Sequence, residues 1–253
     1  MLELTDAIRA RSVLISHSKQ FVLFAPWKTA SQTLRLRLGK YDESPYSPFF
    51  QFNAALNRVV HQHLTCSDFL ALSESKLNYF KGAFVRNPYD RVYSGFIQLQ
   101  RDVEEQRRAT FSPAWVRELV MVQLDGHLAR LKEADFDFDA WWSLVPEHLI
   151  FEAGRDTSFP LHPCHYWTHV NQTPYVEFLG KVENFERDFQ NLCQRLDLND
   201  PDAGNANVTT TTKSEEGTNS SRYAPRMSRA SISKINTLFR EDFSTFGYKP
   251  IPA

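Results

Sequence analysis

Residues 21–38 read FVLFAPWKTASQTLRLRL, and this stretch decides the fold class. Residues 21–25 form a short, continuous apolar run, which is typical of a strand buried on both faces in a parallel sheet. A proline ends the run. The residues after it predict a helix that begins near Ser31 and carries Leu34 and Leu38 on one face. The stretch therefore predicts a buried strand, a short loop and a helix.

The loop between this strand and this helix holds groups that suit a bound phosphate. A helix start offers backbone N–H groups and the positive end of the helix dipole, and the loop adds Lys28 and small hydroxyl side chains. The GxxxxGK[ST] pattern of P-loop nucleotide-binding proteins is absent from the sequence. Taken alone, the segment leaves two interpretations open: a phosphate-binding loop, or a capped helix with an exposed lysine.

Weaker strand candidates alternate with helical patterns along the rest of the chain. The candidate strands are residues 83–85, 149–151 and 175–179, and the helical patterns cover residues 112–131, 185–196 and 232–243. Strands alternating with helices predict an α/β protein with a P-loop-like three-layer fold, in which helices flank a central parallel sheet. In such folds ligands bind beyond the carboxyl ends of the strands.

Composition limits the class of protein. The 253 residues are 42% hydrophobic and 23% charged, with a formal net charge of -1, so we expect a globular chain whose anion binding is local. We expect a single domain over residues 1–253, in which the polar stretch 200–222 is a flexible loop or lid. The sequence shows neither a run of about 18 apolar residues nor a signal-peptide pattern, so we expect a cytoplasmic protein with no integral membrane segment.

Residues 81–96, KGAFVRNPYDRVYSGF, form a second basic segment in which a strand leads into a helix. Asn87 is a good N-cap and is followed by a proline, so the helix is expected to start here. Arg86 stands at the strand end, and Ser94 lies two turns along the same side of the helix as Asn87. A guanidinium and a hydroxyl that reach one ligand suit a phosphate. The alternative is a surface arginine that pairs with Asp90.

Together the two segments resemble the sulfotransferases that use 3′-phosphoadenosine 5′-phosphosulfate (PAPS), particularly the carbohydrate group with the heparan-sulfate 2-O and chondroitin/dermatan enzymes. KTASQT at residues 28–33 is similar to that family's 5′-phosphosulfate loop, and FVRNPYDRVYSGF at 84–96 is similar to its 3′-phosphate segment. EFLGKVENFERDFQNLC at 177–193 resembles the family's DFIGKxExLxxDF, and REDFSTFGY at 240–248 resembles its YxxDFxxFGY. The resemblance covers about residues 21–248.

This resemblance implies PAPS as the donor, 3′,5′-adenosine bisphosphate as the product, and no metal. Lys28 would contact the oxygen that bridges the sulfuryl group and the 5′-phosphate, while Arg86 and Ser94 would hold the 3′-phosphate. Other residues would donate backbone or hydroxyl hydrogen bonds to the phosphosulfate: Thr29, Ala30, Ser31, Gln32 and Thr33. The sequence departs from the family at Trp27, which stands where proline usually precedes the lysine.

Two histidines between the phosphate segments are candidates for acid–base chemistry. His61 and His63 lie two residues apart, hence on one face of an extended segment. The heparan-sulfate 2-O enzymes have a similar HxH whose second histidine is the catalytic base, so the resemblance gives that role to His63. Imidazole, with an ordinary pKa of about 6.5, suits removal of a proton from an alcohol at neutral pH. The alternatives are a pair of metal ligands without an evident third ligand, or half-buried strand residues.

A second histidine cluster lies where relatives often place acceptor-side residues. His162, His165 and Trp167 are therefore candidate substrate contacts, together with His61, and either histidine of this cluster is an alternative base. Tryptophans either stack on a sugar ring or pack in the core, and this choice stays open for several of them: Trp115, Trp141, Trp142 and Trp167.

We therefore predict a sulfotransferase that moves a sulfuryl group from PAPS to an acceptor hydroxyl, with a carbohydrate as the preferred acceptor. Lys28 and His63 are the predicted catalytic residues, and no nucleic-acid partner is expected. Two alternatives remain. One is a non-catalytic member of the fold that binds nucleotide or glycan, and the other is a P-loop-type nucleotide kinase, against which the missing GxxxxGK[ST] counts.

Overall fold

The computed structural model describes residues 13–43, 50–53, 58–61, 63–70, 73–104, 125–151, 161–198 and 221–253. Its contacts divide the chain into two compact units. The sheet unit comprises Thr5–Arg86 and Cys164–Thr218, and the helical unit comprises Met1–Leu4, Asn87–Pro163 and Asn219–Ala253. The single domain over residues 1–253 stays a prediction. Most of the loop predicted at 200–222 lies outside the described residues.

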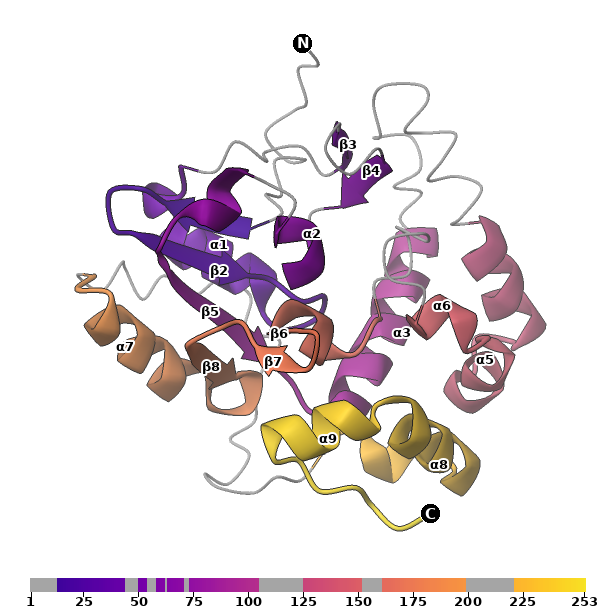
Figure 1. Cartoon of the computed structure of the whole chain (residues 1–253). Helices are drawn as coiled ribbons and strands as arrows, with labels where there is room; N and C mark the ends of the chain where they lie inside the picture. The colour runs from indigo at the N-terminus through magenta and orange to yellow at the C-terminus, as the bar shows by residue number, and fades with distance from the viewer. Residues whose placement is uncertain are drawn as a thin grey trace. The chain divides into compact units, whose positions relative to one another are not determined.

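A four-stranded sheet with the order β1-β2-β5-β8 forms the centre of the sheet unit (Figure 1). Its strands are β1 (Val13–Ser16), β2 (Phe21–Phe24), β5 (Phe80–Val85) and β8 (Phe178–Lys181). Strands β2, β5 and β8 run parallel, whereas β1 pairs antiparallel with β2 at one side. The predicted central sheet is therefore confirmed as mostly parallel, and β1 is an antiparallel addition that the sequence patterns did not predict.

Helical segments cover both faces of this sheet, because alternate side chains of each strand point to opposite faces. On one face, Phe24 and Ala83 pack with Trp167 and with helix α2 (Cys66–Leu70). The opposite face packs against helices α1 (Ser31–Leu38) and α7 (Phe185–Arg195), through a cluster that includes Leu23, Leu34, Phe84, Phe178 and Phe189. The helices predicted near Ser31 and over residues 185–196 are confirmed.

Close packing between neighbouring strands requires a glycine in β8. Gly180 pairs with Phe84 of β5, and a Cβ atom on Gly180 would overlap the Phe84 ring. That ring also packs on Phe185 at the start of α7, with 5.1 Å between ring centroids. The glycine thus lets β5, β8 and α7 approach closely, and this fixes the positions of the strand ends.

Short elements complete the sheet unit. They are η2 (Gly39–Tyr41), the hairpin β3 (Phe50–Asn53) and β4 (Arg58–His61), η3 (Ser73–Lys76), η5 (Cys164–Trp167), the hairpin β6 (His169–Val170) and β7 (Thr173–Pro174), and η6 (Val182–Asn184).

The helical unit has an aromatic core. Its elements are α3 (Pro88–Glu104), a helix over 125–133, α5 (Phe138–Leu144), α6 (His148–Phe151), η7 (Ala224–Arg226), α8 (Arg229–Leu238) and α9 (Arg240–Phe246). The Lys234 ammonium on α8 donates to the carbonyl oxygens of Trp142, at 2.6 Å, and Val145, at 2.7 Å, and so provides hydrogen-bond donors for carbonyl groups at the carboxyl end of α5.

Among the described helices, none combines the length and apolar character needed to span a bilayer.

Several predicted elements differ from the structure. Residues 149–151, predicted as a strand, belong to helix α6, because an apolar run of three residues does not distinguish a strand from a buried helical turn. The strand predicted at 175–179 starts at Phe178, since the Tyr175 N–H donates to Thr168, not to the central sheet. The helix predicted over 232–243 is divided at Phe239 into α8 and α9. For the helix predicted at 112–131, only residues from 125 onward are described, and these are helical.

Candidate active site

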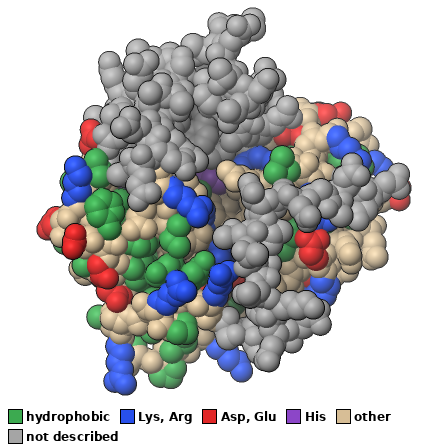
Figure 2. Space-filling view, turned by 180° about the vertical axis from the view of Figure 1, so that it is seen from behind, with side chains coloured by type: hydrophobic (Ala, Val, Ile, Leu, Met, Phe, Trp, Pro, Cys, Tyr) green, Lys and Arg blue, Asp and Glu red, His purple; other side chains and the backbone are tan. Residues whose placement is uncertain are grey.

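Three cationic residues follow or end the three parallel strands. Lys28 lies four residues beyond the end of β2, Arg86 directly follows β5, and Lys181 ends β8. The strands are neighbours, and Val85 pairs with Lys181, so these strand ends lie at the same edge of the sheet. Charged side chains of both signs are spread over the face drawn in Figure 2, in keeping with the net charge of -1. The positive edge is therefore a local feature.

The loop after β2 adopts a left-handed backbone without glycine. Lys28 has φ 64° and Ala30 has φ 62°, and Ala30 is the N-cap residue of α1. Left-handed conformations are uncommon for residues other than glycine and cost free energy. In proteins generally, alternating right- and left-handed residues form concave turns whose backbone N–H groups bind anions. The loop therefore combines two left-handed residues with the start of a helix although it lacks the P-loop glycines.

Hydroxyl groups of the loop differ in their environments. The Thr29 hydroxyl is buried and donates to the Pro26 carbonyl oxygen at 2.7 Å, so it closes the loop from inside. Because the hydroxyl hydrogen is used in this way, the group of Thr29 that can donate to a ligand is its backbone N–H. Along the first turn of α1, Ser31 is buried, Gln32 is exposed and Thr33 is half-buried.

Arg86 brings the second basic segment to this loop. Its Nη1 atom donates to the Lys28 carbonyl oxygen at 3.4 Å, although the two residues are 58 positions apart in the sequence. Both side chains are half-buried. A guanidinium has five N–H donors, and among the described residues this long hydrogen bond uses one of them, so other donors can reach a ligand. The loop that carries Lys28 and the strand end that carries Arg86 are therefore in contact within the sheet unit.

Trp27 gives the lysine an aromatic neighbour. The Lys28 Nζ atom lies 5.9 Å from the centroid of the Trp27 ring, within the range of a cation–π interaction. This contact occurs where the sequence departs from the proline that relatives have before the lysine. The indole therefore occupies a position from which it restricts the Lys28 side chain.

His63 is bound to the end of β2. Its side chain is buried, and its Nδ1 atom lies 2.5 Å from the carbonyl oxygen of Ala25, the residue that follows β2. A carbonyl oxygen only accepts hydrogen bonds, so this contact assigns a proton to Nδ1 and leaves the lone pair on Nε2. The imidazole thus has the tautomer of a base that acts through Nε2. Strand β4 ends at His61, so His63 lies beyond the extended segment, and for His61 the structure describes only its place in β4.

Other predicted contacts lie deeper in the protein. Trp167 is fully buried and donates from Nε1 to the His63 carbonyl oxygen at 3.0 Å. His162 belongs to the helical unit, where its Nδ1 lies 2.7 Å from the Ile150 carbonyl oxygen. His165 is half-buried on η5 and stacks on Tyr166, with 4.5 Å between ring centroids.

The structure describes two of the three remaining candidate tryptophans. Trp141 and Trp142 are fully buried in the helical unit, which favours the core interpretation for both. Trp115 lies outside the described residues.

Helix α3 starts as predicted, but Asp90 has a different partner. The Asn87 Oδ1 atom accepts from the Tyr89 N–H at 3.1 Å, which caps the helix. Asp90 accepts from the backbone N–H groups of Arg222, at 3.2 Å, and Tyr223, at 3.0 Å. Within the helical unit, Asp90 thus anchors a segment that is distant in the sequence. Ser94 lies one turn farther along α3, in the helical unit, and its role at the 3′-phosphate stays a prediction.

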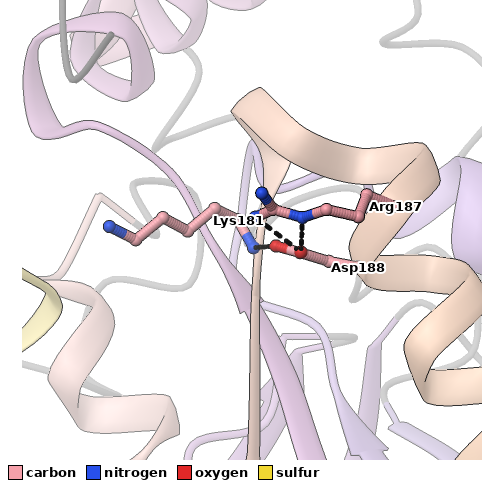
Figure 3. Close-up of polar contacts among 3 residues, drawn as sticks. All are labelled: Lys181, Arg187 and Asp188. Carbon is pink, nitrogen blue, oxygen red and sulfur yellow. Dashed lines mark hydrogen bonds and ion pairs between the residues drawn. The ribbon is translucent and has the colours of Figure 1, made fainter. Parts of the chain in front are cut away.

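Lys181 was not singled out from the sequence, although it lies in the GKxE segment of the resemblance. Its backbone N–H donates to Asp188 Oδ2 at 2.8 Å, and Arg187 donates from Nε to Asp188 Oδ1 at 3.0 Å (Figure 3). The Asp188 carboxylate thus ties α7 to the end of β8. In Figure 3 the Lys181 side chain extends away from Asp188, so its ammonium is a third cationic group at this edge of the sheet, beside Lys28 and Arg86.

These features define an α/β protein with a cationic loop at the carboxyl edge of its mostly parallel sheet. A model of the Sulfotransferase family matches residues 15–249, and the chain therefore belongs to the Sulfotransferase family. No curated protein and no solved structure matched the chain. Membership in this family supports a transferase that moves a sulfuryl group.

Proposed function

We propose that the protein transfers a sulfuryl group from PAPS to the hydroxyl group of an acceptor, and that the acceptor is a carbohydrate. The observation that carries the proposal is the contact between the Arg86 guanidinium and the Lys28 carbonyl oxygen. It joins two cationic segments at the ends of adjacent parallel strands. A nucleotide with phosphate groups at both its 3′ and 5′ positions matches two such segments.

The 5′ end of the donor fits the loop after β2. Its left-handed residues and the start of α1 offer backbone N–H groups, and Lys28 adds an ammonium. During transfer, negative charge develops on the 5′-phosphate oxygen that leaves the sulfur atom, as it does in phosphoryl transfer. A preorganised ammonium beside that oxygen stabilises the transition state more than the ground state, and this difference is what increases the rate.

The acceptor hydroxyl needs a base, and His63 is the residue we assign to it. Its Nδ1–H donates to Ala25, so Nε2 accepts the proton as the hydroxyl oxygen forms its bond to sulfur. Ala25 lies three residues before Lys28 in the same loop. The base and the cation are therefore held by one short segment of backbone.

The choice of a carbohydrate acceptor rests on the resemblance to the heparan-sulfate 2-O and chondroitin/dermatan enzymes. The four matched segments occur in the family's order along this chain. His165 and Lys181 are the described residues that we assign to the acceptor side, because each is at least partly exposed in the sheet unit.

Replacing Arg86 by alanine is expected to weaken the binding of 3′,5′-adenosine bisphosphate by about 10- to 100-fold. The reason is that a charged hydrogen bond to a phosphate is worth about 1.5–3 kcal/mol. Isothermal titration calorimetry with the purified chain measures this change. Arg195→Ala, which removes an exposed arginine of α7 in the same unit, is the matched control and should bind like the unmodified protein. Equal affinities for Arg86→Ala and Arg195→Ala would show that the second segment does not bind this nucleotide.

A further inference from the structure

We propose that Trp167 is a positioning residue for His63: its indole N–H fixes the histidine backbone so that the ring reaches Ala25 and presents Nε2 to the acceptor. This inference rests on the proposed function, because it takes His63 to be the base. It concerns a side chain that the sequence suggested as a substrate contact, and it gives that side chain a different role.

The hydrogen bond between Trp167 and His63 joins distant parts of the sheet unit. Trp167 Nε1 donates to the His63 carbonyl oxygen at 3.0 Å across 104 positions of sequence. The tryptophan ends η5, and its ring is fully buried in the core cluster that contains Phe24 and Phe69. A fully enclosed ring has no face for stacking on a sugar. The polar atom of this side chain therefore acts inside the protein.

His63 needs such a support because it belongs to neither a strand nor a helix. It lies in a bend after β4 and before α2. On its carboxyl side, Thr65 and Asp68 form a capping box: Asp68 N–H donates to Thr65 Oγ1 at 3.2 Å, and Thr65 N–H donates to Asp68 Oδ2 at 3.4 Å. The start of α2 is thereby fixed, and the Trp167 hydrogen bond fixes the carbonyl group of His63 itself.

Together these contacts relate the imidazole to the phosphosulfate loop. The His63 carbonyl oxygen is held by Trp167, and its ring Nδ1 is held by the carbonyl oxygen of Ala25. With both ends fixed, the ring keeps one orientation and one tautomer. Loss of the indole N–H leaves a buried carbonyl group without this donor and lets the backbone at residue 63 shift. A small displacement of a catalytic group lowers the rate strongly.

The test is Trp167→Phe, which keeps an aromatic ring and removes the N–H. Its matched control is Trp142→Phe, because Trp142 is also fully buried but its Nε1 has no hydrogen-bond partner among the described residues. We expect Trp167→Phe to lower kcat about tenfold with an unchanged KM for PAPS. Trp142→Phe should lower the unfolding midpoint to a similar extent and leave kcat unchanged.

A spectroscopic measurement separates positioning from a loss of packing. In ¹⁵N-histidine-labelled protein, we expect the His63 signals to show a protonated Nδ1, with assignment by comparison with His63→Gln. These signals should shift in Trp167→Phe and stay in place in Trp142→Phe. Equal kcat values for the two tryptophan variants, with His63 signals unmoved in both, would overturn the positioning role. If the unmodified protein transfers no sulfuryl group, the proposed function fails, and the NMR comparison still decides whether Trp167 positions His63.

Discussion

The Lys28→Ala variant is expected to lose at least about 100-fold in kcat while it keeps the fold of the unmodified protein. Removal of one donor that stabilises developing negative charge typically costs about 100- to 1,000-fold in kcat. Lys28 is half-buried in the loop before α1, and its ammonium group lies 5.9 Å from the centroid of the Trp27 ring. Alanine accepts the left-handed φ of 64° no worse than lysine does, so the loop should keep its shape.

Steady-state kinetics with PAPS and a carbohydrate acceptor, with thermal unfolding measured in parallel, test this expectation. Lys40→Ala is a suitable control, because Lys40 is an exposed residue of η2 in the same unit. The control should keep full activity. If Lys28→Ala keeps a kcat close to that of the unmodified protein, Lys28 does not stabilise the charge on the leaving 5′-phosphate oxygen.

Replacement of His63 by alanine is expected to lower kcat by about 100- to 10,000-fold, the usual contribution of a positioned general base. Affinity for 3′,5′-adenosine bisphosphate should change little, since the imidazole is assigned to the acceptor and not to the nucleotide. Because His63 is buried and bonded to Ala25, the alanine variant also loses a structural contact. His63→Asn is therefore needed beside it, because the asparagine amide nitrogen takes the place of Nδ1 and can still donate to Ala25, but it is not basic.

His165→Ala provides the comparison for this prediction. His165 is a half-buried histidine of the sheet unit, and its ring stacks on Tyr166. We expect His165→Ala to retain most of its kcat and both His63 variants to lose it, as measured by initial rates at saturating PAPS and saturating acceptor, where a weaker acceptor contact at His165 changes KM and not kcat. The opposite pattern would move the base from His63 to His165.

The strand and helix that carry each cationic segment were predictable because their signals are local. The apolar run before Pro26 is short and closed by a proline, and Asn87 and Pro88 form a recognisable helix start. Each signal lies within a few residues of the element that it specifies. Strand β2, helix α1, strand β5 and helix α3 therefore agree with the sequence patterns.

General sequence patterns did not predict the backbone geometry of the loop that carries Lys28. A left-handed position is usually occupied by glycine, which makes it recognisable in the sequence. Here Lys28 and Ala30 adopt this conformation instead. A search for the P-loop glycines alone misses the loop, whereas the KTASQT segment revealed it through the resemblance. The left-handed conformation of these two residues costs free energy, and the surrounding structure keeps it in place. One of the contacts that does so is the hydrogen bond from Thr29 to Pro26.

The contacts of the base depend on distant parts of the chain. His63 meets Ala25 across 38 positions of sequence and Trp167 across 104. No periodicity or spacing encodes such pairs, because they arise only when the sheet brings its strands together. The same reason explains Asp90, which the sequence offered as a partner of Arg86 and which accepts from the backbone of Arg222 and Tyr223.

The central claim is that the cationic segments at Lys28 and Arg86 bind the two ends of one nucleotide. The most direct measurement is calorimetric titration of the unmodified protein with 3′,5′-adenosine bisphosphate and with adenosine 5′-monophosphate, repeated on Arg86→Ala. The account predicts that the 3′-phosphate tightens binding at least about tenfold in the unmodified protein and that this advantage disappears in Arg86→Ala. Equal affinity of the unmodified protein for the two nucleotides would contradict it.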